Sequence, residues 1–206
     1  MSETAPRPDG APFDAPTVFV GDSLTEGGDW QDWLTDERVV NLGVSGDTTD
    51  DLIARLDDVI GHRPGTVVLL IGTNDLAWRR GAEHIVRNIE TILVTLRREL
   101  PDTQILVQSI LPREHIYAKT IKDANRHLWQ FASTVRAQYL DLWPVLAEND
   151  AIDPRFSPDG LHLNDAGYEA WRSELVPALE TLRGLAPSSR AIVLPGGLQG
   201  FGRAAG

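Results

Sequence analysis

Four short clusters of small and polar residues carry the groups that acyl transfer requires. Ser23 lies in the first cluster, Gly-Asp-Ser-Leu, while Gly46, Asn74 and the pair Asp159 and His162 lie in the later ones. A serine hydroxyl becomes a strong nucleophile when an imidazole accepts its proton, and a carboxylate that fixes the imidazole tautomer completes the set. Asp159 and His162 suit these two supporting roles. The combination predicts attack by Ser23 on an ester carbonyl.

The clusters also supply donors for the charge that such an attack creates. Negative charge gathers on the carbonyl oxygen and is stabilised by hydrogen-bond donors that are already in place. The backbone N–H groups of Ser23 and Gly46 and the side-chain amide of Asn74 are three suitable donors. Glycine at position 46 lets the backbone approach the oxygen closely. We therefore predict an oxyanion hole made by these three residues.

The apolar pattern predicts an α/β fold. Short runs rich in Val, Ile and Leu predict buried strands at 17–20, 38–42, 66–71, 104–110 and 139–142. Helical spacing predicts helices at 48–60, 82–100, 121–136 and 164–183, the last with Asn164 as N-cap and a kink or break at Pro177. This alternation is typical of a three-layer α/β/α, flavodoxin-like fold, a doubly wound sheet of about five parallel strands in the order 2-1-3-4-5.

Such a sheet would gather the four clusters at one edge. Ligands bind beyond the carboxyl ends of the strands, and Ser23, Gly46 and Asn74 follow the first three strands. The fifth strand would lie roughly 14 Å from the first. Asp159 and His162 therefore need the long loop at 148–163 to reach Ser23.

The four clusters, in this order, resemble the sequence blocks of the SGNH, or GDSL-type, hydrolase family of esterases and lipases. The matching stretches are GDSLTEGG, NLGVSGDTT, IGTND and DGLHLNDAGY, which lie within residues 18–168. The resemblance implies Ser23 as nucleophile, His162 as general base and then acid, and Asp159 as the carboxylate that orients it. Gly46 and Asn74 are implied as oxyanion donors.

Within this family, three stretches are most similar to the catalytic subunits of intracellular platelet-activating-factor acetylhydrolases and their bacterial relatives: GVSGDTT, the Leu-Pro-Arg at 111–113, and LHLNDAGY. This similarity implies short acyl groups such as acetyl, while a sugar O-acetyl group, a thioester and a lysophospholipid stay open as substrates. The second block contains another glycine, Gly43, to which we assign a turn role. Trp78 and Tyr117 either wall the acyl or alcohol pocket or are partly buried aromatics that shield the loops.

Several rival chemistries fit the sequence less well. A magnesium-dependent phosphoryl transferase would use Asp22 or the acidic run at 47–51, but the Asp-x-Asp spacing is missing at 22–24, and the run more simply opens a helix. The remaining histidines lack the spacing of zinc ligands. A general α/β-hydrolase would place its serine in Gly-x-Ser-x-Gly after a later strand.

We therefore predict a serine carboxylic-ester hydrolase that uses no metal and no cofactor and acts on a small-molecule ester. A thioesterase or lysophospholipase on the same site is one alternative. A non-catalytic binding module is another, although such a module would be expected to lack the serine, asparagine or histidine of the clusters, and all three are present.

Composition limits partners and location. The 30 acidic and 19 basic residues give a net charge of -11, which disfavours nucleic acids and anionic membranes as partners. The chain has no cysteine, so disulfides and cysteine nucleophiles are excluded. No apolar run reaches the ~18 residues of a membrane span, and the first residues do not resemble a secretory signal, so we expect a cytoplasmic location.

The ends of the chain differ from its middle. Residues 1–16 contain four prolines and are predicted to form a flexible arm, followed by one hydrolase domain at 17–184. Residues 185–206 form a Gly- and Pro-rich tail, through which the chain could form a homo-oligomer.

Overall fold

A five-stranded parallel sheet forms the centre of the structure, a computed structural model that describes residues 15–185. The strands are β1 (Thr17–Gly21), β2 (Val39–Gly43), β3 (Thr66–Leu70), β4 (Gln104–Gln108) and β5 (Gln138–Leu140). They are paired in the order β2-β1-β3-β4-β5, and in the central register Val18 lies between Val40 and Val67. The predicted fold class and strand order are confirmed.

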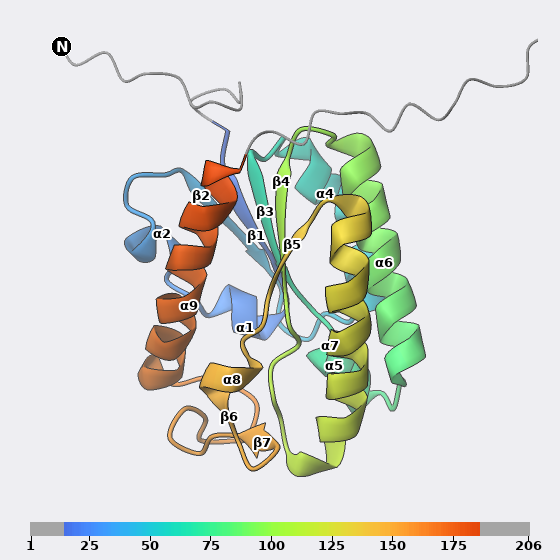
Figure 1. Cartoon of the computed structure of the whole chain (residues 1–206), viewed down its shortest axis with the longest axis vertical. Coiled ribbons are helices and arrows are strands. Elements are labelled where there is room, and N and C mark those ends of the chain that lie inside the picture. The colour runs from blue at the N-terminus through green and yellow to red at the C-terminus, as the bar shows by residue number, and fades with distance from the viewer. Residues whose placement is uncertain (1–14, 186–206) are drawn as a thin grey trace, which may run out of the picture.

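Helices cover both faces of this sheet (Figure 1). One face carries α3 (Thr49–Ala54), α4 (Leu56–Gly61), α6 (Ala82–Glu99) and α7 (Ala118–Ala132). The other carries α1 (Ser23–Glu26), α2 (Trp30–Trp33), α8 (Trp143–Leu146) and α9 (Asp165–Gly184). The remaining elements are α5 (Thr73–Ala77), the 3₁₀ turns η1 (His115–Tyr117) and η2 (Ser133–Val135), and the hairpin of β6 (Ala147–Glu148) and β7 (Ala151–Ile152).

Alternation along the strands divides the core into two layers. Val18 faces the layer beneath α6, whereas Phe19 faces the opposite layer, where its ring stacks on Trp30 at a centroid distance of 4.3 Å. The indole N–H of Trp30 donates to the carbonyl of Thr25 in α1 at 2.7 Å. This bond satisfies the buried indole and ties the aromatic layer to the turn that begins with Ser23.

Some element boundaries differ from those predicted. The helix expected at 48–60 is two helices, because Arg55 has non-helical backbone angles while its guanidinium binds Asp47 and the carbonyl of Gly21. Helix α7 begins earlier than expected and ends at Ala132, before η2 and a left-handed residue, Arg136.

The last helix meets one expectation and excludes part of another. It continues through Pro177 without a break, because Leu175 and Leu179 on either side are buried against the sheet, while a kink at Pro177 stays a prediction. Asn164 is its N-cap, as predicted, and accepts a hydrogen bond from the backbone N–H of Gly167 at 3.0 Å.

Short elements escaped the sequence analysis. Helices α1, α2, α5 and α8 and the β6–β7 hairpin contain two to five residues each, too few to show a period. The predicted arm at 1–16 and tail at 185–206 fall outside the described residues, apart from residues 15, 16 and 185. Between residues 15 and 185, no helix combines the length and the apolar character that a membrane crossing needs.

Candidate active site

Ser23 follows a sharp turn at the carboxyl end of the central strand. β1 ends at Gly21, where a Cβ atom would lie 2.1 Å from the carbonyl oxygen of Leu70, so only glycine fits. Asp22 is the N-cap of α1, and its Oδ1 accepts the backbone N–H of Leu24 at 3.0 Å. Ser23 therefore begins a helical turn at the sheet edge where ligands bind in this fold.

Ser23, His162 and Asp159 form a continuous hydrogen-bonded chain. Oγ of Ser23 lies 3.2 Å from Nε2 of His162, whose Nδ1 lies 2.8 Å from Oδ2 of Asp159. The loop after β7 brings both residues of the pair across the sheet edge to Ser23, as the sequence predicts. This is the geometry in which an imidazole can accept a serine proton while a carboxylate holds the ring.

Asp159 is held as a carboxylate by the loop itself. Its side chain receives the ring N–H of His162 and the backbone N–H groups of His162 and Leu161, and these bonds hold the pKa of Asp159 well below its usual range. The side chains of Asp159 and His162 are both 51% exposed. The pair is therefore oriented by hydrogen bonds rather than by burial.

Asn74 and Gly46 lie in the segments that follow β3 and β2, the two strands on either side of β1. Asn74, the second residue of α5, donates from Nδ2 to the carbonyl of Asp47 at 2.9 Å. Gly46 precedes Asp47 and has φ of 86°, in the left-handed region that favours glycine. The bond joins the loops after β2 and β3 and leaves the second amide hydrogen of Asn74 for another acceptor.

Two residues that the sequence analysis missed also join these loops. Arg55 binds Oδ2 of Asp47 at 2.6 Å and the carbonyl of Gly21 at 3.0 Å, which ties the Gly46 loop to the end of β1. Asp75 is fully buried and accepts from both the backbone N–H and the hydroxyl of Thr49, at 2.9 and 2.7 Å. Asp75 belongs to the IGTND block, so a sequence motif marks it as a residue of the site. Arg55 lies in a helical stretch outside the four clusters, and no motif marks it.

Asp22 is a buried carboxyl beside Ser23. Burial is the main cause that raises its pKa to about 7, and the nearby charge of Asp47 adds to the shift, while the bond from Leu24 opposes it. Within the described part of the chain, Oδ2 of Asp22 has no hydrogen-bond partner. The structure therefore favours a protonated Asp22 below neutral pH.

The other residues singled out from the sequence lie near the same edge. Gly43 is not a turn residue: it ends β2, where a Cβ would lie 2.2 Å from the backbone nitrogen of Glu26 in α1.

Trp78 is 72% exposed at the end of α5. Tyr117 is partly buried in η1, and the guanidinium of Arg113 lies 4.7 Å from its ring centre. A role for Trp78 or Tyr117 in binding substrate stays a prediction.

Two carboxylates and a histidine form a cluster where α3, α5 and α6 meet. Asp50, Asp75 and His84 place their potential ligand atoms within 4.8 Å of one another, although they come from three helices and show no zinc-like spacing in the sequence. Arg80 lies between the carboxylates, 2.7 Å from Asp50 and 3.2 Å from Asp75. Its guanidinium supplies the positive charge that a cation would supply, so the cluster is an ion-pair network.

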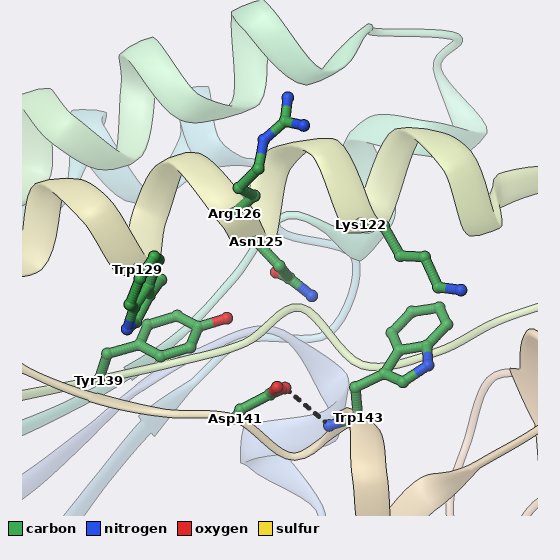
Figure 2. A pocket seen from close by; sticks show the side chains of 7 residues that line it. All are labelled: Lys122, Asn125, Arg126, Trp129, Tyr139, Asp141 and Trp143. Atoms are coloured by element: carbon green, nitrogen blue, oxygen red, sulfur yellow. Dashed lines mark hydrogen bonds between the residues drawn. The ribbon is translucent and has the colours of Figure 1, made fainter.

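A groove of about 510 Å³ opens elsewhere, between α7, β5 and the start of α8 (Figure 2). It is lined by Lys122, Asn125, Arg126, Trp129, Tyr139, Asp141 and Trp143. The amide of Asn125 is used by the backbone of Ile110, and Lys122 is paired with Asp150. These lining residues include no serine and no histidine, so the groove does not repeat the arrangement of Ser23 and His162.

Comparison with known proteins shows the family of this chain. A sequence model of the GDSL-like lipase/acylhydrolase family matches residues 19–170, which include all four clusters. The chain belongs to this family. As a GDSL-like acylhydrolase it is a serine ester hydrolase, which confirms the class of enzyme predicted from the sequence.

Relatives of this acylhydrolase include two named enzymes. Over 163 residues it is 27% identical to platelet-activating factor acetylhydrolase IB subunit alpha2 of Rattus norvegicus, covering 73% of this chain and 70% of that protein. Over 165 residues it is 31% identical to the acetylxylan esterase of Geobacillus stearothermophilus, covering 66% and 75%. A GDSL-like lipase structure from Bacteroides thetaiotaomicron covers 82% of this chain and 89% of its own, with a TM-score of 0.71 and 22% identity, and shows the shared fold alone.

Proposed function

We propose that Ser23, His162 and Asp159 are the catalytic triad of this esterase and that Ser23, Gly46 and Asn74 form its oxyanion hole. The observation that carries the proposal is the unbroken chain from Oγ of Ser23 through the His162 ring to Asp159. Its two links, 3.2 and 2.8 Å, are of the length expected between a nucleophile and its base and between a base and its orienting group.

In the proposed reaction, Oγ of Ser23 attacks the ester carbonyl carbon while its proton passes to Nε2 of His162. The carbonyl oxygen becomes an oxyanion that accepts from the backbone N–H groups of Ser23 and Gly46 and from the free amide hydrogen of Asn74. The alcohol leaves with the proton from His162, and the acyl group stays on Ser23. A water molecule that gives a proton to His162 then attacks the acyl group, and His162 returns this proton to Oγ of Ser23 as the acid leaves.

The proposed substrates are small esters of short acyl groups, including O-acetyl groups. Two relatives support this class, because the names of both enzymes, an acetylhydrolase and an acetylxylan esterase, specify an acetyl group. The open position of the triad also supports it, because the side chains of Asp159 and His162 are half-exposed and a small ester can approach them from solvent. A thioester or lysophospholipid substrate is the alternative on the same site.

Hydrolysis of p-nitrophenyl esters from acetyl to decanoyl, by the native chain and by Ser23→Ala with a chelator present, tests the proposal. We expect turnover that survives the chelator, is fastest for the short acyl groups and is lost in Ser23→Ala. Turnover by Ser23→Ala at the native rate would contradict the assignment of the nucleophile. A preference for decanoyl would favour the lysophospholipase alternative, and no ester turnover would favour a non-catalytic binding module.

Two further expectations stay predictions. A homo-oligomer formed through residues 185–206 can be tested by sedimentation of the full chain and of a chain that ends at residue 184. A cytoplasmic location can be tested by fractionating cells that produce the native protein.

A further inference from the structure

Arg113 is a buried arginine in the loop between β4 and η1, and only 8% of it is exposed. Its NH1 group donates to the carbonyl oxygen of Thr73 at 3.1 Å. That carbonyl belongs to the peptide group that joins Thr73 to Asn74. The guanidinium therefore holds the backbone immediately before the proposed oxyanion donor.

The rest of Arg113 is fixed from three directions. Nε binds Oε2 of Glu114 at 3.1 Å, and the guanidinium lies over the ring of Tyr117. The backbone carbonyl of Arg113 accepts the N–H of Ile152 in β7 at 2.9 Å. The residue thus links the loop after β3 to the hairpin that leads into the loop carrying Asp159 and His162.

Glu114 extends this link to the catalytic loop itself. A Cβ atom at Gly160 would lie 3.5 Å from Cγ of Glu114, so the Glu114 side chain packs beside Gly160. Gly160 follows Asp159 and has φ of 78°. The pair formed by Arg113 and Glu114 therefore touches the two loops that contribute Asn74 and the Asp159 and His162 pair.

We propose that Arg113 is a positioning residue that sets the oxyanion donor Asn74 relative to the catalytic His162, an inference that rests on the proposed role of Asn74. The bond to Thr73 fixes the orientation of the Thr73–Asn74 peptide group. The bonds to Glu114 and Ile152 fix the distance between that peptide group and the catalytic loop. Errors of about 1 Å in such positions cost large factors in rate, because the donors must meet the oxygen where its charge develops.

The arrangement needs an arginine. Burial of a charged group costs free energy unless the group is paired and hydrogen-bonded. Here the guanidinium uses separate N–H groups for Thr73 and Glu114 and lies over the ring of Tyr117. Lysine has one point charge and cannot make these contacts from one rigid plane. Methionine keeps much of the apolar stem and provides no donor.

The test is a double-mutant cycle on p-nitrophenyl acetate hydrolysis with Arg113→Met, Asn74→Ala and the double variant, and with exposed Arg87→Met as the control. We expect Arg113→Met to lower kcat roughly tenfold to a hundredfold with KM within about twofold of native. Its affinity for benzeneboronic acid, which forms a tetrahedral anion on a catalytic serine, should fall by a similar factor. In the Asn74→Ala background the same change should lower kcat less than about threefold further, because the two residues act as one unit.

The inference would be overturned if the fold-reduction of kcat in the double variant equalled the product of the fold-reductions in the two single variants. Native kcat and native boronate affinity in Arg113→Met would also overturn it. If Arg113→Met does not fold, Arg113→Lys decides: a melting temperature near native with kcat lowered about tenfold supports the inference, and native kcat overturns it. Native kcat in Asn74→Ala itself would instead contradict the proposed oxyanion hole. The two failures are therefore distinguishable.

Discussion

The side-chain amide of Asn74 donates to the carbonyl oxygen of Asp47 at 2.9 Å, across the gap between the loops that follow β2 and β3. Asp47 comes directly after Gly46, so this bond places the two proposed oxyanion donors on one connected unit. Arg55 extends the unit to Gly21, at the end of the strand that precedes Ser23. The three proposed donors are thus held in place by protein contacts before any substrate is bound, which is the condition for effective stabilisation of a developing charge.

Loss of the Asn74 donor should affect the chemical step more than substrate binding. Because the donor is used most strongly in the transition state, Asn74→Ala should lower kcat roughly a hundredfold or more and leave KM within a few-fold of native. Steady-state kinetics with p-nitrophenyl acetate measures both, and exposed Gln130→Ala serves as the control. A rise in KM at native kcat would show that Asn74 binds the ground state instead.

Asp159→Asn should impair His162 without displacing it. An amide at position 159 can accept the ring N–H of His162, but it lacks the charge that stabilises the imidazolium and can also impose the wrong tautomer. We expect kcat to fall roughly 10³-fold while the melting temperature changes little, because Asp159 is half-exposed. Exposed Asp36→Asn is the matched control, and a fall of less than tenfold in Asp159→Asn would exclude the triad role.

The buried carboxyl of Asp22 should make stability depend on pH. Its pKa is raised to about 7 in the folded chain, so its contribution to stability is fully present below its ordinary value near 3.8 and is lost as the pH rises towards 7. Asp22→Asn can still accept the N–H of Leu24 and cannot ionise. The free energy of unfolding of this variant, relative to native, should therefore increase between pH 4 and pH 8, by at most about 4 kcal/mol.

Urea unfolding at several pH values checks this dependence, and the difference between Asp22→Asn and the native chain is the quantity to compare. A difference that stays constant with pH would show that Asp22 ionises as readily in the folded chain as in the unfolded one. Activity of the same variant separates stability from catalysis, because the proposed mechanism does not use Asp22 as an acid or a base.

Gly43 and Gly61 form a matched pair for testing close packing at the site. A Cβ at Gly43 would lie 2.2 Å from the backbone of Glu26 and must displace α1, whereas a Cβ at Gly61 meets nothing within 4 Å. Gly43→Ala should lower both the melting temperature and kcat, because α1 begins with Ser23. Gly61→Ala, at the end of α4, should keep native kcat and leave the melting temperature unchanged or raised. Equal behaviour of the two variants would contradict the close approach at Gly43.

Much of the fold follows from the sequence because the buried strands are short apolar runs separated by long amphipathic helices. The run around Val18 and the spacing of Ile85, Ile89 and Ile92 were enough to predict β1 and α6. Continuity through Pro177 was not predictable in the same way, since it depends on burial of the residues on either side, which is a tertiary effect. The split at Arg55 likewise depends on partners far away in the chain.

The clusters allowed the proposed catalytic residues to be singled out from the sequence, whereas the contacts that hold them were not predictable. Ser23, His162 and Asp159 meet because strand order and one long loop bring them together, and both features were readable from the sequence. Arg55 and Arg113 donate hydrogen bonds to backbone carbonyls. Every residue has such a carbonyl, so the residue type of the acceptor gives no information. No pattern in the sequence marks which carbonyl an arginine will reach.

In the proposed mechanism Ser23 carries the acyl group during turnover. Acid quenching of the native chain during hydrolysis of p-nitrophenyl acetate, followed by peptide mass spectrometry, locates that group directly. We predict a single site of acetylation, on the peptide that contains Ser23, with at most one acetyl group per chain. An acetyl group on another residue of the native chain would contradict this mechanism. So would the absence of an acyl-enzyme together with undiminished turnover by Ser23→Ala.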